Sequence, residues 1–338
     1  MTLAAHMRAP RRACELALLL FLLVATAHGS PAETIFPAAE LRPIWLISTR
    51  GAPFCGPHDG PPAELAYWRC DDHAGWMPAT REGFLTGGDS DLPTCFFIHG
   101  NRYTHAEAIE YGLLAWRRLV NNGCVTGPVR FVIWSWPSER TCDGNMEDAR
   151  IKAIRSEAQG FYLAHLMDQI PPQTPLSFVG YSYGARLGTA ALHLLGGSRL
   201  GGNQLSERVH PERAPISAVL LAPAMDNDWL IPGRRYGQAL EQVDRLLILY
   251  NSRDIVLKRY RFLDPSRPQA LGYTGMVWTA AAAGRVTQID VTSWLGRSHQ
   301  AEDYLNTPAL VRRMLPYAFP WSLQSSHYGQ AVHFPQTP

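Results

Sequence analysis

The sequence predicts an α/β fold in which a mostly parallel, eight-stranded-type sheet is covered by helices on both faces. Short, continuous apolar runs alternate with longer segments whose apolar residues recur at helical spacing. Continuous apolar runs are typical of strands buried on both faces. The chain has 338 residues, of which 46% are apolar and 18% charged, so it can bury a sizeable core. We therefore expect ligands to bind at the carboxyl ends of the strands.

The first residues are expected to be a targeting segment. Three arginines precede an apolar run from Leu16 to Thr26, and small residues offer cleavage after Ala27 or Gly29. This is the pattern of a secretory signal peptide. The run is shorter than the roughly 20 residues that span a bilayer. We expect residues 1–29 to be removed, leaving an exported, periplasmic or extracellular protein with no stable membrane span; an uncleaved N-terminal anchor is the alternative.

The charge balance argues against one class of partner. The chain has 31 basic and 29 acidic residues, and residues 1–27 account for the whole excess. A neutral mature chain lacks the positive charge that nucleic-acid binding requires. We therefore expect no nucleic-acid partner.

The expected elements divide the exported chain into three regions. Residues 30–92 hold a first strand at 44–47 and a stretch rich in Gly, Pro and Trp at 51–88, interpreted as a long loop or a small antiparallel extension. Residues 93–318 form the α/β core, and residues 319–338 are an irregular tail. Within the core we expect strands at 95–98, 130–134, 176–179, 218–221, 246–250 and 286–291, and helices at 106–120, 148–170 and 186–195.

Five cysteines follow the targeting segment, and export would permit disulfides. Cys55 with Cys70 and Cys124 with Cys142 are the expected pairs, because both lie in segments typical of loops, although connectivity stays open. Cys95 begins an apolar run and is expected to be a buried thiol. The spacings show no zinc pattern, and no metal or organic cofactor is implied.

The pentapeptide Gly180-Tyr181-Ser182-Tyr183-Gly184 follows one apolar run and precedes a helical segment. A G-x-S-x-G sequence between a strand and a helix is typical of a nucleophile elbow, where side chains larger than Gly would collide with both elements. The alternative is a Gly-rich turn in which Ser182 only caps the helix. The strand before and the helix after favour Ser182 as a nucleophile.

An acid and a base should follow the serine in the order Ser, Asp, His. Asp254 follows the strand expected at 246–250, and His299 lies on a Gly-containing loop after the strand expected at 286–291. We expect these two to act with Ser182 as a catalytic triad. The alternatives are Asp226 and Asp228 for the acid and His327 and His333 for the base.

The loop after the strand at 95–98 reads His99-Gly100-Asn101. In this architecture that loop supplies one N–H of an oxyanion hole, and the residue after the nucleophile supplies the other. We assign them to the backbones of Asn101 and Tyr183, and each donor would lower the barrier by about 3 kcal/mol. His99 is expected to shape the loop.

These residues resemble the α/β-hydrolase superfamily. The likeness spans Pro93 to Tyr304 and is greatest to a bacterial branch with an HGYN-like oxyanion loop and an S-W-P-S segment, here Ser135-Trp136-Pro137-Ser138. The sequence departs from that branch at Asn101-Arg102-Tyr103, and it has Tyr183 where many hydrolases have Met or Leu. The resemblance implies a fold and a triad but no substrate.

Aromatic residues near these motifs could line a pocket, and the alternative is core packing. For Trp134 core packing is favoured, because this residue belongs to a strand. The segment from Asp226 to Arg235 is a candidate for a short lid. The aromatic candidates are Trp134, Trp136, Tyr103, Tyr181 and Tyr183.

The residues predict an exported serine hydrolase, of the carboxylesterase or lipase type, that acts on a small-molecule or lipid-like acyl substrate through an acyl-enzyme. A peptidase or amidase would use the same chemistry with another pocket. A second hypothesis is a catalytically idle scaffold that binds a cell-envelope ligand or partner. A dinucleotide-binding domain is excluded because no G-x-G-x-x-G opens a helix after a strand.

The targeting segment generates a first prediction. The mature protein should begin at His28 or Ser30, because small residues precede both positions. N-terminal sequencing of the exported protein checks this. An intact mass that still includes residues 1–27 would contradict it.

Overall fold

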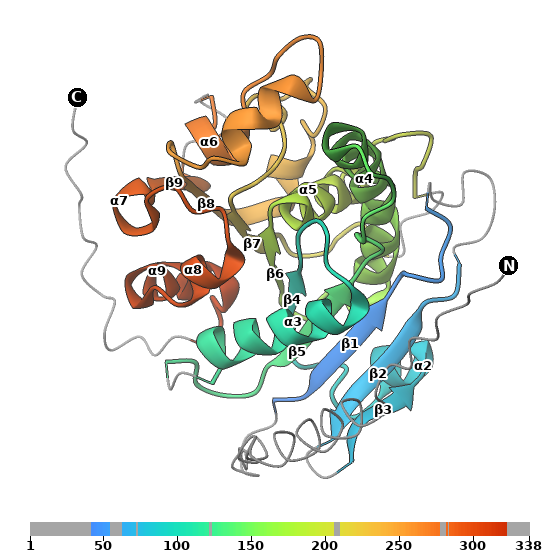
Figure 1. Cartoon of the computed structure of the whole chain (residues 1–338). Helices are drawn as coiled ribbons and strands as arrows, with labels where there is room; N and C mark the ends of the chain where they lie inside the picture. Colours follow the sequence, from blue (N-terminus) through green and yellow to red (C-terminus); the bar gives the residue numbers. More distant parts are fainter. Residues whose placement is uncertain are drawn as a thin grey trace, which may run out of the picture. The chain divides into compact units, whose positions relative to one another are not determined.

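The computed structural model describes residues 42–54, 63–71, 74–121, 124–205, 210–277, 282 and 284–322. Its strands are β1 (Ile44–Ser48), β2 (Ala66–Asp71), β3 (Gly75–Ala79), β4 (Thr94–Ile98), β5 (Arg130–Ser135), β6 (Leu176–Tyr181), β7 (Ile216–Leu221), β8 (Val243–Tyr250) and β9 (Val286–Asp290). Over these ranges the nine strands form one sheet in the order β3-β2-β1-β5-β4-β6-β7-β8-β9 (Figure 1). Only the two pairings of β2 are antiparallel. The mostly parallel sheet is confirmed, with one strand more than the eight expected.

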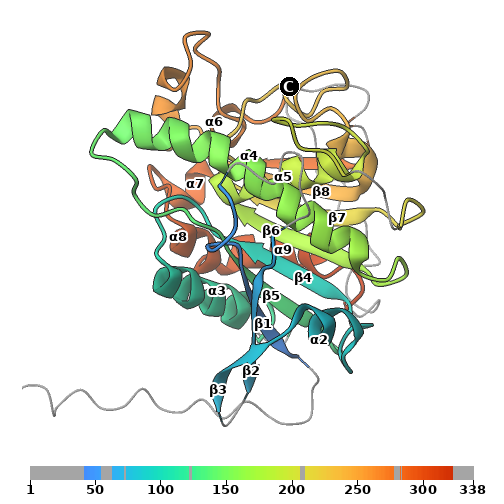
Figure 2. The ribbon, with the colours of Figure 1, turned by 90° about the vertical axis from the view of Figure 1, so that its right-hand side faces the viewer.

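The β2–β3 hairpin adds two strands to the seven that were located in the sequence. It lies within the Gly-, Pro- and Trp-rich stretch at 51–88 and extends one edge of the sheet (Figure 2). Tyr67 is the one fully buried residue of β2, and β3 has none. An antiparallel edge of this kind can face water on one side. Of the two interpretations of this stretch, the small antiparallel extension is the one observed.

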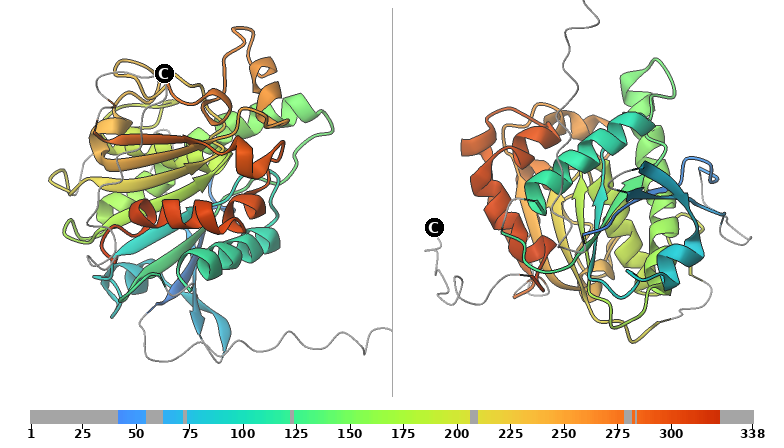
Figure 3. Two further views of the ribbon diagram at one scale, coloured as in Figure 1. Left: turned by 90° about the vertical axis from the view of Figure 1, so that its left-hand side faces the viewer. Right: turned by 90° about the horizontal axis from the view of Figure 1, so that it is seen from below.

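Helices cover both faces of the sheet (Figure 3). They are α2 (Arg81–Thr86), α3 (His105–Leu119), α4 (Asn145–Gln169), α5 (Tyr183–Leu195), α6 (Leu271–Thr274), α7 (Thr292–Leu295), α8 (Ala301–Leu305) and α9 (Pro308–Ala318), with 3₁₀ helices η1 (Ala239–Gln242) and η2 (Leu257–Phe262). Helices α3, α8 and α9 pack together on one face, and α4 packs with α5 on the other. Strands β1 and β4 to β7 are therefore buried throughout, which explains their continuous apolar sequences. None of the helices in the described ranges is both long and apolar enough to cross a bilayer.

Helices α8 and α9 were not predicted. Helix α9 buries Leu310, Val311, Met314 and Leu315, which recur at helical spacing. Its start is marked by a proline at the first helical position. These signals were in the sequence, but Pro316 lies inside the helix and interrupts the pattern.

The cysteines differ in part from the expectation. Cys142 is a free thiol that donates to the carbonyl of Gly144 at 3.7 Å, so the expected Cys124–Cys142 bridge is wrong. The turn that starts α4 directs this thiol to the nearby backbone instead. Cys95 is a fully buried free thiol, as expected, and burial raises its pKa to about 12. Cys55 lies outside the described residues, so its pairing with Cys70 stays a prediction.

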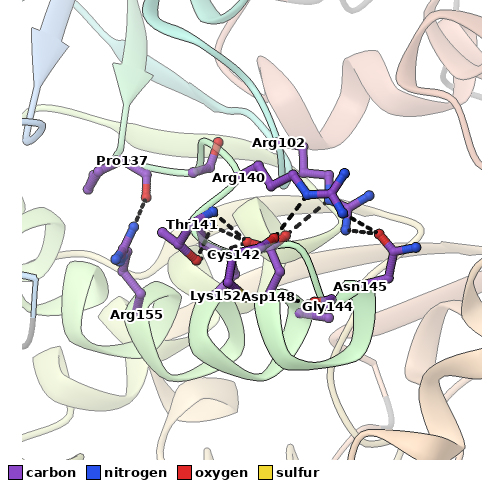
Figure 4. Close-up of polar contacts among 12 residues, drawn as sticks. Arg102, Pro137, Arg140, Thr141, Cys142, Gly144, Asn145, Asp148, Lys152 and Arg155 are labelled. Carbon is purple, nitrogen blue, oxygen red and sulfur yellow. Dashed lines mark hydrogen bonds and ion pairs between the residues drawn. The ribbon is translucent and has the colours of Figure 1, made fainter.

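A buried carboxylate joins the connections that follow two neighbouring strands, β4 and β5 (Figure 4). Asp148 accepts hydrogen bonds from Lys152 Nζ at 2.8 Å, from Thr141 N at 2.9 Å and from Thr141 Oγ1 at 3.0 Å. Its second oxygen accepts from Arg102 Nε at 3.1 Å. Arg102 lies between β4 and α3, whereas Thr141 lies between β5 and α4. Asp148 therefore fixes one connection against the other.

The ionisation of Asp148 follows from these partners. Burial alone would raise the pKa of this carboxyl group, but the hydrogen bonds from Lys152, Thr141 and Arg102 outweigh burial and hold its pKa well below its usual range. Lys152 is also fully buried, so the two charges depend on each other. Removing one partner of such a pair leaves an uncompensated buried charge.

We expect Asp148→Asn to lower the free energy of unfolding by about 3–5 kcal/mol, because it leaves the Lys152 ammonium buried without a carboxylate. Denaturant unfolding measures the loss. The double variant Asp148→Asn/Lys152→Met is the control and should recover much of it. Because the pKa of Asp148 is depressed, its stabilisation should be present above a pH of about 4 and lost on further acidification. A loss below about 1 kcal/mol at neutral pH would contradict the role of the pair.

Candidate active site

Ser182 lies on a strained turn between β6 and α5. Its backbone angles are φ 53° and ψ −114°, a conformation that costs free energy for any residue with a β-carbon. Ser182 N donates to Leu221 O at 2.9 Å, and Ser182 O accepts from Ala224 N at 3.2 Å. Backbone bonds from the neighbouring strand β7 and the residues after it therefore hold the turn in place.

The two glycines of the pentapeptide are required by close backbone packing. A β-carbon at Gly184 would lie 2.1 Å from Ile98 O, and one at Gly180 would lie 2.7 Å from Ala185 Cα. Neither neighbour is a side chain that could move aside. The glycines let the first turn of α5 lie directly against the end of β4, as the elbow interpretation predicts.

His299 lies on the loop after β9 and contacts the serine. Its Nε2 is 3.1 Å from Ser182 Oγ, and its Nδ1 is 2.6 Å from Asp254 Oδ2. With Nδ1 donating to the carboxylate, Nε2 is left to accept the serine hydroxyl proton. The backbone carbonyl of His299 accepts from Tyr181 Oη at 2.8 Å, which ties this loop to β6.

Asp254 is fully buried after the end of β8. Its Oδ1 accepts from the backbone N–H groups of Val256 at 2.8 Å and Leu257 at 2.9 Å, which leaves Oδ2 for His299. Asn251 Nδ2 donates to Ser298 O at 2.9 Å and so ties the end of β8 to the loop of His299. The structure thus brings Ser182, His299 and Asp254 into one hydrogen-bonded chain.

The alternative acids lie elsewhere. Asp226 accepts from Tyr260 Oη at 2.7 Å, and burial raises the pKa of its carboxyl group. Asp228 is 3.5 Å from Arg234 Nε. Neither is hydrogen-bonded to a histidine in the described ranges. The alternative bases, His327 and His333, lie outside the described residues.

Asn101 and Tyr183 both line the pocket that contains Ser182. In the part of the chain that the structure describes, neither backbone N–H donates to a protein acceptor. Both groups are therefore available to an oxygen atom bound beside the serine. Gly100 permits the approach of this loop, because a β-carbon there would lie 2.7 Å from the ring of Tyr181.

His99 shapes the oxyanion loop through Trp136. His99 Nε2 accepts from Trp136 N at 3.1 Å, and Trp136 Nε1 donates to His99 O at 2.8 Å. The other ring nitrogen, Nδ1, lies 2.9 Å from Gly100 O. The two rings are nearly parallel, at 9° and 5.7 Å. Burial lowers the pKa of His99 to about 3, so it remains neutral and positions the loop.

Sequence reasoning left the rest of the S-W-P-S segment without a role. Ser138 O accepts from Arg102 N at 2.8 Å, and Ser138 Oγ accepts from Tyr103 N at 3.0 Å. Ser135 Oγ accepts from Arg50 Nε at 2.8 Å. The segment therefore holds the backbone on the far side of Asn101, where Arg102 has a φ of 63°. The signal was the motif itself, but its contacts depend on the pairing of β4 with β5.

The pocket beside Ser182 has a volume of about 560 Å³. Of the five aromatic candidates, Tyr103, Tyr181 and Tyr183 line it, whereas Trp134 and Trp136 are fully buried and do not. Sequence reasoning missed Tyr111 of α3 and the residues of η2, including Tyr260, which also line it. Those positions become neighbours of Ser182 only through the fold.

The segment from Asp226 to Arg235 does not cover this pocket, so the lid expectation is corrected. Arg235 pairs with the buried Glu157, which also accepts from Arg186 Nη2 at 2.6 Å. The ring of Trp229 lies 4.5 Å from the guanidinium group of Arg186 and 5.1 Å from that of Arg235. These contacts fasten the segment over a neighbouring hollow. The described residues contain no cluster of His, Cys, Asp and Glu suited to a metal ion.

Comparison with known proteins gives weak likenesses. No protein-family model and no curated protein matches the chain. Carboxyl esterase 2 of Tuber melanosporum is similar, with 14% identity, a TM-score of 0.40, and coverage of 89% of this chain and 98% of that chain. Acyl-protein thioesterase 2 of Zea mays has 15% identity, a TM-score of 0.34, and coverage of 66% and 94%. A predicted CIB-like hydrolase of Thermoplasma acidophilum has 12% identity, a TM-score of 0.32, and coverage of 75% and 91%.

At these identities and TM-scores the likenesses carry no argument about activity or fold. The sheet is parallel from β1 through β9 apart from the β2–β3 edge, and helices cover both faces. The serine lies on an elbow after β6, and an aspartate and a histidine follow β8 and β9 in that order. This combination defines the α/β-hydrolase fold. The chain has that fold.

Proposed function

We propose that the protein is a serine hydrolase that cleaves a carboxylic ester or a related acyl compound, and that Ser182, His299 and Asp254 are its catalytic residues. The observation that carries the proposal is the hydrogen-bonded chain from Ser182 Oγ through both ring nitrogens of His299 to Asp254 Oδ2. It ends on a serine whose strained backbone persists only because the surrounding strands hold it. Strain of this kind is typical of functional residues.

The proposed reaction proceeds by acyl transfer. His299 Nε2 takes the hydroxyl proton as Ser182 Oγ forms a bond to the carbonyl carbon, and the oxyanion accepts from the N–H groups of Asn101 and Tyr183. His299 then gives the proton to the oxygen of the leaving alcohol as the bond between that oxygen and the acyl carbon breaks. Water, deprotonated by His299, attacks the acyl carbon. The bond between that carbon and Ser182 Oγ then breaks, His299 returns the proton to Oγ, and the acid is released. Asp254 keeps Nδ1 protonated and stabilises the imidazolium throughout.

The pocket supports an acyl group of moderate size. Its volume of about 560 Å³ is in the range of small-molecule sites, and aromatic rings line much of it. Tyr181 and Tyr183 flank the serine in sequence, and Tyr103 lies beyond Asn101. Arg102, Glu107 and Arg259 also line the pocket, but its aromatic rings offer apolar surface to a hydrocarbon acyl chain. A carboxylesterase or lipase type of activity is therefore favoured over a peptidase.

We further propose that the protein is exported. Export is supported by the signal pattern of residues 1–29, which precede the described part of the chain. An exported hydrolase would meet acyl compounds of the cell envelope or the medium.

Ser182→Ala should abolish hydrolysis of short p-nitrophenyl esters, because Oγ forms the covalent bond. The variant should unfold like the wild type, since the held backbone of this turn needs no hydroxyl group. A fluorophosphonate probe should label the wild type at Ser182 and leave the variant unlabelled. Ester turnover near the wild-type rate in the variant would sink the assignment. Absence of labelling in the wild type would favour the idle-scaffold hypothesis.

Asp254→Asn should lower kcat by up to about 10⁴-fold, because the amide no longer holds the required histidine tautomer. Asp226→Asn is the matched control and should change kcat little, since Asp226 bonds to Tyr260 and not to His299. Steady-state kinetics on one ester measures both. A large loss in the Asp226 variant with little loss in the Asp254 variant would move the acid to the segment after β7.

A further inference from the structure

Residues 253–263, here called the mouth segment, carry an unusual concentration of exposed cations. Arg253, Lys258, Arg259 and Arg261 are all exposed. Within the described chain none of them forms an ion pair with a carboxylate. The one acid of the segment, Asp254, is fully buried and bonded to His299. The exposed charges of the mouth segment are therefore all positive, and no carboxylate within the segment neutralises them.

The mouth segment and the neighbouring part of α4 also expose apolar side chains. Ile255, Val256 and Phe262 are 46%, 49% and 54% exposed, and Ile154 of α4 is 65% exposed. These are four of the eight large apolar side chains that are exposed in the described residues. Arg150 of α4 donates to the carbonyls of Leu263 at 2.8 Å and Phe262 at 3.1 Å. Ile154, one turn further along α4, lines the same hollow as Leu263, so this exposed apolar residue lies near the end of the mouth segment.

The mouth segment forms part of the wall of the pocket that contains Ser182. Val256, Arg259 and Leu263 line the Ser182 pocket together with Met146 from the first turn of α4. In Figure 1 the chain between β8 and α6 lies beside the start of α4. A partner bound to the mouth segment would therefore meet the pocket opening directly.

Cations and apolar groups on one surface fit one partner better than others. An anionic lipid layer attracts arginine and lysine to its head groups while apolar side chains enter the acyl boundary. A soluble acidic polymer would satisfy the cations but leave Phe262, Ile255 and Ile154 in water. We propose that the mouth segment and Ile154 dock on an anionic lipid surface and so present acyl substrates of that layer to Ser182. The substrate part of this proposal rests on the proposed hydrolase function.

The test is sedimentation with vesicles of equimolar phosphatidylglycerol and phosphatidylcholine, with pure phosphatidylcholine vesicles as the comparison. Each variant is purified in the form that accumulates in the cells, and intact-mass measurement verifies that all variants share one N-terminus. The wild type should bind the anionic vesicles more tightly and lose binding as salt is raised. Arg253→Gln/Lys258→Gln/Arg261→Gln, three exposed residues that do not line the Ser182 pocket, should weaken that binding by about 100-fold, at roughly fivefold for each charge. The matched control Arg117→Gln/Arg245→Gln/Arg312→Gln removes three exposed charges on α3, β8 and α9 and should bind like the wild type.

The apolar half of the surface is tested separately. Phe262→Ser should weaken binding to the anionic vesicles by at least about tenfold, as expected when a large buried apolar side chain is lost from an interface. Equal binding by the wild type and the triple glutamine variant would overturn the proposal. A loss with the glutamine variant but none with Phe262→Ser would also overturn it, because the apolar side chains would then take no part in binding.

A further variant separates this proposal from the proposed function. Ser182→Ala should bind the vesicles like the wild type, because docking needs no nucleophile. The triple glutamine variant should hydrolyse a soluble p-nitrophenyl ester at close to the wild-type rate but lose hydrolysis of vesicle-borne ester. Equal loss on both substrates would overturn docking as the cause. Persistent hydrolysis by Ser182→Ala would instead overturn only the hydrolase assignment.

Discussion

The close approach between the first turn of α5 and the end of β4 is the constraint on which the site depends. Only a glycine fits at position 184, where a β-carbon would lie 2.1 Å from Ile98 O and 2.5 Å from His99 O. This contact places Ser182 beside the loop of Asn101 before any ligand is bound. A larger residue would separate the helix from the strand and move Ser182 away from the loop of Asn101. The same contact therefore positions both the turn of Ser182 and the loop of Asn101.

Polar groups around this contact position the loops without reacting. Burial lowers the pKa of His99 to about 3, so at neutral pH its ring is neutral and can accept from Trp136 N. Asp148 has the opposite behaviour, remaining ionised because Lys152, Thr141 and Arg102 donate to it. One neutral and one charged anchor thus hold the connections after β4 and β5. Such satisfied networks keep a site within the small displacements that catalysis tolerates.

The sequence predicts those parts of the fold whose signal is local. The core strands β4 to β7 are continuous apolar runs because both of their faces are buried. Ser182, Asp254 and His299 could be named because each follows a strand in the order that the fold requires. The contact of Asp148 with Arg102 and the η2 side chains of the pocket could not, because these neighbours lie far away in sequence. The free thiol of Cys142 could not either, because cysteine spacing does not determine disulfide connectivity. The lid expectation was wrong because the buried Glu157 ties that segment down.

The mouth segment combines two tasks on opposite sides of one short stretch of chain. On its inner side, Asp254 Oδ1 accepts from the backbone of Val256 and Leu257, while Oδ2 faces His299. On its outer side, Arg253, Lys258 and Arg261 are exposed to solvent. Because the inner bonds use backbone N–H groups, the outer side chains can vary without removing a hydrogen bond from the acid. Selection on the outer surface can therefore change where the protein docks while the geometry of Ser182 stays the same.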